Sequence, residues 1–406
     1  MAENPITIRR LILKRFRSVP AQGVVFSNPT FLVGKNGSGK SNVVDAFAFL
    51  SECMALPLQA VFDTRGGIAA VRHRTASRSY PPNMGIGIEF DFPNGAGIGG
   101  GYAFEIKALP NYGFKVVREQ CRVVTKDKTA WFDRGEEDFR STVRGIQPSF
   151  DPQALALPVV GGTKEFAPVV KGLSLLRVYS IEPTQVRELQ EPDVGTNLKS
   201  DGSNLASVLQ ALARKYGSDL GRLCEILETI IPGTMNVRPV KHGKKLSLEF
   251  TQQWGEGKGK QIKFEAFVMS DGTLRALGIL GALFQKPVPT LIAIEEPEST
   301  IHPEALGTIL DVIRMASATT QIVATTHSPE LLDADWIEPE NIRIVTWGEG
   351  VTRVLPLGAA SVKALKEHLM GAGEQFRSNA LRPDEYPLFE EGNLDQPELL
   401  FQELHK

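Results

Sequence analysis

The chain has 406 residues, of which 42% are hydrophobic and 23% are charged, proportions typical of a globular protein with an ordinary core. Its 45 basic and 47 acidic residues give a formal net charge of −2, which excludes a global electrostatic attraction to nucleic acid or membrane, so any basic surface must be local. Three widely spaced cysteines (Cys53, Cys121 and Cys224) predict neither a disulfide framework nor a zinc site.

The same features predict a cytoplasmic protein. An odd, scattered set of cysteines favours a reducing compartment. No apolar run reaches the ~18 residues that a membrane helix needs, and residues 1–18 lack the apolar core and cleavage site of a signal peptide. We therefore expect no contact with a membrane.

The N-terminal part of the chain predicts mainly strands. Residues 6–16 alternate loosely and suggest a basic edge strand, followed by Arg17, the one basic residue here that we expect near a ligand. Period-two patterns predict three more strands over 85–92, 102–109 and 113–124. The glycine-rich segment 94–101 is interpreted as a hairpin loop, because no helix follows it.

Residues 126–170 have a mixed composition and are interpreted as part of an insertion, with a helix around 129–143. A strand is expected at 173–181 and a pair of packed helices from 205 to 227.

From residue 235 the period-two pattern returns and predicts three strands joined by turns, with six lysines between Lys241 and Lys263. Two interpretations of the lysines stay open: a solvated hairpin and a rim that contacts nucleic acid. A helix over 273–285, buried strands at 290–294 and 321–325, and a helix near 361–370 follow. Residues 383–404 contain seven carboxylates and no Lys or Arg, which predicts a docking arm or a disordered tail.

A glycine-rich loop joins the apolar run 31–33 to a helix-like pattern over 43–50. Residues 34–41 read Gly-Lys-Asn-Gly-Ser-Gly-Lys-Ser, the pattern of a P-loop, in which backbone N–H groups and the helix N-terminus bind phosphate. Lys40 supplies a positive charge for the β and γ phosphates, and Ser41 offers a hydroxyl to Mg²⁺. The residues expected to bind the nucleotide are Arg17, Gly34, Asn36, Gly37, Ser38, Gly39, Lys40, Ser41 and Asn42.

Two further segments place polar groups at the ends of buried strands. Glu295 and Glu296 follow the apolar run 291–294. We expect Glu295 to hold Mg²⁺ through water, together with Ser41, and Glu296 to orient and deprotonate the attacking water. His327 ends the second buried strand and is a candidate sensor of the γ-phosphate.

Residues Ser270, Asp271 and Gly272 precede a helix and form a second candidate anion site. A second phosphate site in one chain would be redundant. We therefore expect this helix to cap the γ-phosphate bound by a partner copy, which gives a head-to-tail homodimer, or a higher homo-oligomer, with shared ATP sites.

The motifs GKNGSGKS, MSDGTLR, LIAIEEPESTIHP and ATTHS resemble, in this order, the Walker A, signature, Walker B/D-loop and switch-histidine segments of ABC-type ATPases of the RecF/SMC/OLD branch. The EEPE…HP form is similar to that of the stand-alone ATPases of the AAA-15/AAA-21 type, and DGSNLASVL and LKRFRS fit the same group. The resemblance covers about 1–60 and 173–360.

The resemblance implies an α/β fold, a P-loop NTPase of the ABC-ATPase type with a mixed central sheet, an antiparallel β subdomain and a helical or inserted lobe. We expect an ATPase lobe with the P-loop and β subdomain over 1–125 and an insertion over 126–172. The lobe with the signature, Walker B and switch histidine then covers 173–360, and a C-terminal helix and acidic tail cover 361–406.

The resemblance also implies an Mg²⁺-dependent ATPase whose dimerisation is driven by ATP. Such a switch acts on DNA or controls an effector directed at nucleic acid. The alternative is an ATPase scaffold of an anti-phage or toxin-type defence complex that holds a separate nuclease or toxin chain.

The chain departs from the family pattern at Glu295, where an Asp is commoner, and it lacks both a long coiled coil and room for a Toprim nuclease domain. The sequence shows no clear Q-loop, and Gln185 is a candidate for its residue.

Overall fold

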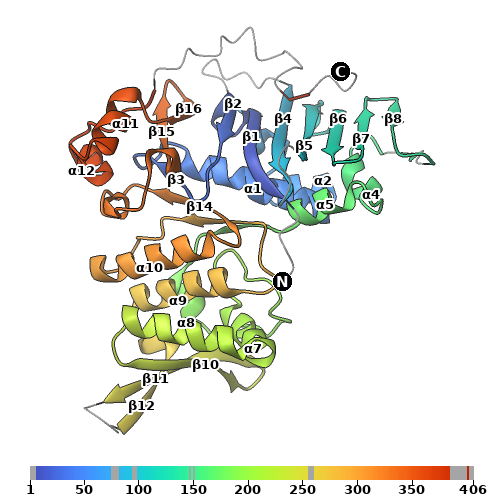
Figure 1. The fold of residues 1–406 in the computed structure, drawn as a ribbon. Helices are drawn as coiled ribbons and strands as arrows, with labels where there is room; N and C mark the ends of the chain where they lie inside the picture. Colours follow the sequence, from blue (N-terminus) through green and yellow to red (C-terminus); the bar gives the residue numbers. More distant parts are fainter. Residues whose placement is uncertain are drawn as a thin grey trace. The chain divides into compact units, whose positions relative to one another are not determined.

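The computed structural model describes residues 6–74, 82–93, 98–145, 148–149, 151–254, 260–384 and 400–401. The chain forms two compact units (Figure 1). The P-loop unit comprises 3–176, 339–363 and 382–406, and the signature unit comprises 177–338 and 364–381. Most of the predicted acidic tail, four residues of the glycine-rich loop (94–97) and the turn 255–259 lie outside the described residues.

A seven-stranded antiparallel sheet dominates the P-loop unit, with the order β2-β1-β4-β5-β6-β7-β8. The strands are β1 (Thr7–Phe16), β2 (Val19–Val25), β4 (Asn83–Asp91), β5 (Gly99–Ala108), β6 (Phe114–Val124), β7 (Thr129–Arg134) and β8 (Phe139–Ser141). The three period-two strands are thereby confirmed as β4, β5 and β6.

Two predictions about this sheet are wrong. The first strand does not lie at an edge, because β1 pairs with β2 on one side and β4 on the other. Residues 129–143 do not form a helix: β7 and β8 continue the sheet beyond β6. The burial of alternate residues in β7 explains why, since one side of this strand packs into the core.

The inner surface of the sheet packs against helix α1 (Lys40–Ala55) through aromatic residues. The ring of Phe49 on α1 has its centroid 5.8 Å from that of Phe16 on β1 and 6.5 Å from that of Phe104 on β5. All three residues are buried, so this cluster fixes α1, and with it the P-loop, against the sheet. The remaining helices before β9 are α2 (Leu58–Asp63), α3 (Ile68–Val71), α4 (Ala156–Val160) and α5 (Ala167–Leu173).

Three other strands of this unit support the P-loop. They are β3 (Thr30–Val33), β15 (Ile342–Gly348) and β16 (Val351–Pro356), in the order β16-β15-β3. Strand β15 is parallel to β3 and antiparallel to β16, so this group is mixed, as the fold class requires. Helix α11 (Ala359–Lys366) follows β16.

In the signature unit the strand order is β14-β13-β9, and β13 and β14 are parallel. Helix α9 is buried along most of its length because its apolar residues extend all round it. The elements are β9 (Leu176–Tyr179), α6 (Pro183–Arg187), α9 (Asp271–Phe284), β13 (Leu291–Glu295), α10 (Pro303–Ala316), β14 (Gln321–Thr326) and α12 (Ala372–Arg377).

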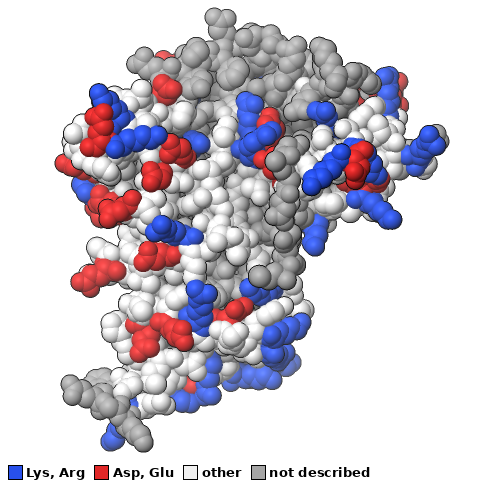
Figure 2. Space-filling model, viewed as in Figure 1, with Lys and Arg blue, Asp and Glu red and all other residues white. Residues whose placement is uncertain are grey.

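A smaller antiparallel sheet packs with two helices in the same unit. Its parts are α7 (Leu205–Lys215), α8 (Gly217–Ile230), β10 (Thr234–His242), β11 (Lys245–Trp254) and β12 (Lys260–Glu265). Lys and Arg side chains gather over α7 and β10 in Figure 2. Two of the cations, Arg238 and Lys263, pair with Glu249, so the basic surface is partly neutralised within the sheet. Among the described residues, no helix is long and apolar enough to cross a membrane.

Candidate nucleotide site

The P-loop connects the buried strand β3 to α1, as the sequence predicts. Helix α1 begins at Lys40, directly after Gly39. Gly39 has a φ of 96°, and a Cβ at this position would lie 2.0 Å from Thr352 Oγ1. Because both conditions exclude a side chain, only glycine fits here. The loop and the helix N-terminus together form a backbone anion site.

Two buried polar groups of the loop are suited to phosphate. Lys40 Nζ donates hydrogen bonds to the carbonyl oxygens of Gly34 (2.8 Å) and Lys35 (3.1 Å), so its charge is held across the loop. Ser38 is 4% exposed, and its Oγ has no hydrogen-bond partner among the described atoms. An ammonium and a free hydroxyl donor are groups that bind phosphate oxygens.

A chain of hydrogen bonds from β16 also fixes the P-loop, and no sequence motif predicted it. Asn42 Nδ2 donates to Ser18 Oγ (2.6 Å), Ser18 lies 2.7 Å from Thr352 Oγ1, and Thr352 donates to the carbonyl oxygen of Ser38 (2.9 Å). Thr352 is 1% exposed. It therefore holds the P-loop from a position more than 300 residues away in the sequence.

We expect Thr352→Val to destabilise the chain by roughly 1–3 kcal/mol, because the carbonyl of Ser38 loses its buried donor. ATP affinity should fall as well, since the loop loses the bond that fixes its shape. Chemical denaturation and calorimetric titration with ATP measure the two effects. Thr346→Val on the neighbouring strand β15 is the matched control, and unchanged ATP binding by Thr352→Val would contradict the assignment.

Arg17 is paired within the chain. Its Nε and Nη2 lie 3.0 Å and 2.9 Å from Asp45 Oδ2 on α1, and Nη1 donates to the carbonyl oxygen of Ala70 (3.2 Å). It has a φ of 52°, a left-handed value that these bonds stabilise. Its role in nucleotide binding stays a prediction.

In the signature unit, the acidic pair and the histidine meet at the ends of two parallel strands. Glu295 on β13 is in register with Thr325 on β14. His327 Nδ1 lies 3.2 Å from Glu296 Oε1. Glu296 has a φ of 44°, which is unusual for a residue with a side chain and is a feature often found at active sites. A carboxylate and an imidazole thus lie at ion-pair distance from each other, without the geometry of a hydrogen bond.

Two residues that the sequence analysis left without a role hold this pair in place. Arg275 on α9 is 9% exposed and donates to the carbonyl oxygens of Ile181 (2.7 Å), Glu295 (3.0 Å) and Glu296 (2.9 Å). Burial lowers the pKa of its guanidinium, and the nearby carboxylates oppose this effect. Glu298 Oε1 accepts hydrogen bonds from Thr326 Oγ1 (2.6 Å) and from the backbone N–H of His327 (3.3 Å).

The signature residues form the N-terminus of α9. Ser270 Oγ accepts a hydrogen bond from the backbone N–H of Thr273 (3.2 Å) and so caps the helix. Asp271 pairs with Arg187 of α6 (2.5 Å). A Cβ at Gly272 would lie 2.5 Å from the carbonyl oxygen of Thr300, so packing within the chain requires this glycine independently of any nucleotide. Ser270 and Asp271 are exposed.

Gln185, the Q-loop candidate, lies on α6 two residues before Arg187, and its role stays a prediction.

The oxygen donors named for Mg²⁺ fit this ion. A serine hydroxyl (Ser41) and a carboxylate (Glu295) are hard ligands of the kind that Mg²⁺ prefers. Within the described ranges there is no group of three or more His, Cys, Asp or Glu residues that could hold a metal.

The fold defined by these elements is that of a P-loop ATPase of the ABC type, as two solved SMC head structures show. The first, an SMC head bound to the C-winged helix domain of ScpA, is 16% identical, with a TM-score of 0.56 over 89% of this chain and 99% of that chain. The second is an SMC head with an extended coiled coil bound to the C-terminal domain of ScpA, derived from Pyrococcus furiosus. It is 15% identical, with a TM-score of 0.54 over 90% and 99% of the two chains.

Residues 30–151 and 161–333 match the AAA-21 family, described as "AAA domain, putative AbiEii toxin, Type IV TA system". The chain belongs to this family of ATPases. The comparison with curated proteins gave no match.

Proposed function

We propose that the chain is an ATP-binding and ATP-hydrolysing switch of the RecF/SMC/OLD type, which dimerises with ATP in the cytoplasm and acts on DNA or controls an effector directed at nucleic acid. The observation that carries the proposal is the Glu296–His327 pair, 3.2 Å apart at the ends of two parallel strands. The match to an ATPase family and the similarity of the fold to SMC heads also support the proposal.

The proposed mechanism assigns each of these residues one role. Lys40, Ser38 and the amides of the P-loop bind the phosphates. Ser41 and Glu295 would hold Mg²⁺, which would supply positive charge against the phosphates. Glu296 accepts the proton of the attacking water, and His327, whose Nδ1 is within reach of that carboxylate, contacts the γ-phosphate.

Ser270, Asp271 and Gly272 complete the site of a second copy in the proposed dimer. The exposure of Ser270 and Asp271 supports this role, because a partner can reach them. Phe267 and Val268, which shortly precede Ser270 in the sequence, are 64% and 55% exposed. They add apolar surface that a partner copy can contact.

We expect the Glu296→Gln protein, which should bind ATP without turning it over, to have twice the monomer mass in light scattering with Mg²⁺ and ATP. Ser270→Arg in the same background should remain monomeric, because a large cation blocks the approach of the partner, and should still bind ATP. Ala318→Arg, at an exposed position after α10, is the control and should still dimerise. A strictly monomeric Glu296→Gln protein at high concentration would argue against the shared site.

A second candidate is an ATPase scaffold or sensor subunit of a defence complex that holds a separate nuclease or toxin. The family description, which names a toxin of a toxin–antitoxin system, favours it. Electrophoretic shift of duplex DNA over a series of salt concentrations separates the two candidates, since direct phosphate contacts weaken steeply with salt. A lack of ATP-dependent DNA binding favours the scaffold.

A further inference from the structure

The outer surface of the seven-stranded sheet contains a trough lined by small residues. Gly87 of β4 lies in register with Ile12 of β1 on one side and with Ala103 of β5 on the other. Ala103 is in turn in register with Gln120 of β6. Because side chains stand perpendicular to a sheet, a glycine and an alanine in the middle of such a row leave a depression between the larger residues of β1 and β6.

The chain itself places two apolar residues in this trough. Leu400 and Phe401 are 6% and 5% exposed and form one hydrophobic cluster with Ile12 and Ala103. A Cβ at Gly87 would lie 3.3 Å from Leu400 Cδ2, so the glycine makes room for the leucine. The Arg118 guanidinium lies 4.5 Å from the centroid of the Phe401 ring, a cation–π distance.

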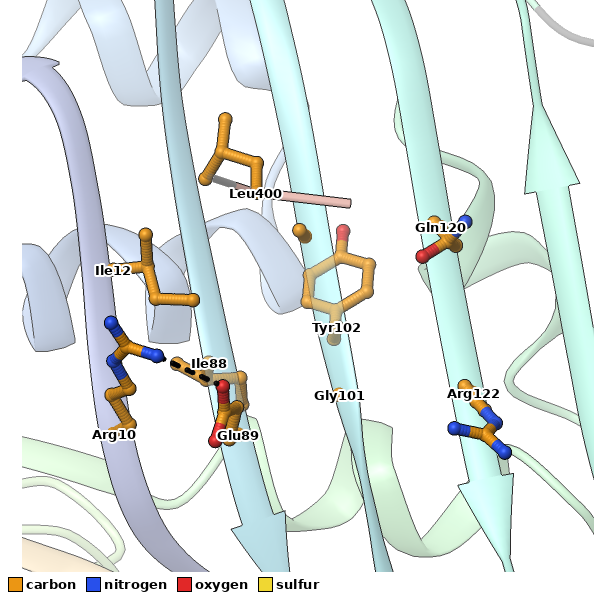
Figure 3. Close-up of a pocket in the computed structure, with 10 residues that line it drawn as sticks. Arg10, Ile12, Ile88, Glu89, Gly101, Tyr102, Gln120, Arg122 and Leu400 are labelled. Carbon is orange, nitrogen blue, oxygen red and sulfur yellow. Dashed lines mark hydrogen bonds and ion pairs between the residues drawn. The ribbon is translucent and has the colours of Figure 1, made fainter. Parts of the chain in front are cut away.

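Next to Leu400 the trough continues as a pocket of about 100 Å³. Figure 3 shows Arg10 and Glu89 on one side of it and Arg122 on the other, with Gly101 between them. Arg10 lies 3.5 Å from Glu89, whereas Arg122 makes no ion pair with any described residue. The Nε atoms of both arginines are buried without a hydrogen-bond partner in the described part of the chain. The pocket therefore suits a carboxylate beside the apolar pair.

We propose that this trough is a docking site for a segment of a partner protein in which two adjacent apolar side chains are flanked by carboxylates. Leu400 and Phe401 occupy it in the chain alone and show the required chemistry: in the sequence, Glu398 and Glu403 flank them. A partner segment binds by displacing the apolar pair and by pairing a carboxylate with Arg122. The proposal goes beyond the nucleotide switch and does not depend on ATP hydrolysis.

The test uses a fluorescent peptide of residues 397–404, Pro-Glu-Leu-Leu-Phe-Gln-Glu-Leu, and fluorescence anisotropy. The full-length Leu400→Ser/Phe401→Ser protein should bind it about tenfold or more tightly than the wild type, because a tethered competitor acts at an effective concentration near the millimolar range. Should that variant not fold, Leu400→Ala in the full chain gives the same comparison.

Adding Arg122→Ala to the Leu400→Ser/Phe401→Ser protein (the open variant) should weaken its binding of the peptide about fivefold or more, as the loss of a charge-assisted hydrogen bond predicts. Arg140→Ala on the exposed strand β8 is the control and should leave binding unchanged. A peptide with Gln in place of both glutamates should not respond to Arg122→Ala. If the Leu400→Ser/Phe401→Ser protein binds the peptide no better than the wild type does, the trough does not accept this sequence from another molecule and the proposal is overturned.

Discussion

Glu296→Gln is expected to lower the rate of ATP hydrolysis at saturating ATP by about 100- to 1000-fold, within the range that a general base contributes. An amide has the shape of the carboxylate but cannot accept the proton of the attacking water. ATP affinity should be unchanged, because the substitution leaves the P-loop untouched. Release of phosphate and equilibrium binding of a labelled ATP measure the two quantities separately.

The substitution is a clean test because the bonds that position Glu296 belong to its backbone. Its N–H donates to the carbonyl oxygen of Thr325 (3.1 Å), and its own carbonyl accepts from Arg275 (2.9 Å). Glu304→Gln, an exposed carboxylate in the first turn of α10, is the matched control. Full activity in the Glu296 variant would remove this residue from the catalytic role.

The parts of the site that could be predicted are those in which one short segment contains both the chemistry and its position. The P-loop pattern specifies a strand, a turn and a helix within 20 residues, and the structure has all three. Likewise, Glu296 and His327 each follow an apolar run of parallel-strand type, and the ends of parallel neighbours lie at one edge. Local sequence was sufficient for both.

The supports of the site could not be predicted, because they join segments that are distant in the sequence through backbone atoms. Thr352 donates to a carbonyl of the P-loop, and Arg275 donates to three carbonyls. Every residue has a backbone carbonyl, so the sequence does not show which residues accept these bonds. The error about β1 has a similar origin. The basic residues of 6–16 suggested an edge strand, but Lys14, one of them, is 2% exposed and its Nζ lies 2.9 Å from Glu105, 91 residues later.

The buried carboxylate of Glu119 on β6 should be the most important polar group for stability. It is fully buried and accepts hydrogen bonds from Tyr102 Oη (2.9 Å) and from the backbone N–H groups of Ala156 and Leu157. Arg134 lies 3.7 Å away. These bonds tie the N-terminus of α4 to the sheet.

We expect Glu119→Ala to destabilise the chain by about 3–5 kcal/mol, because it leaves an arginine and three donors buried without their acceptor. That is a large part of the 5–15 kcal/mol typical of a folded protein. Glu136→Ala, which breaks the partly exposed pair with Lys115 on the same sheet, is the control and should cost no more than about 1 kcal/mol. Urea denaturation followed by circular dichroism gives both values.

The pH dependence gives the Glu119 assignment a second, independent test. Burial raises the pKa of this carboxyl above its ordinary value of 4.5, although the hydrogen bonds and Arg134 oppose the shift. The folded chain then holds a proton that the unfolded chain releases. The stability contributed by this proton is therefore fully present below pH 4.5 and is lost as the pH rises through the folded pKa.

The wild type should lose free energy of unfolding over this pH interval relative to Glu119→Gln, whose side chain does not titrate. Parallel pH profiles of the two proteins would contradict a raised pKa, and Glu119 would then be a carboxylate already ionised at low pH and stabilised by its three hydrogen-bond donors and Arg134.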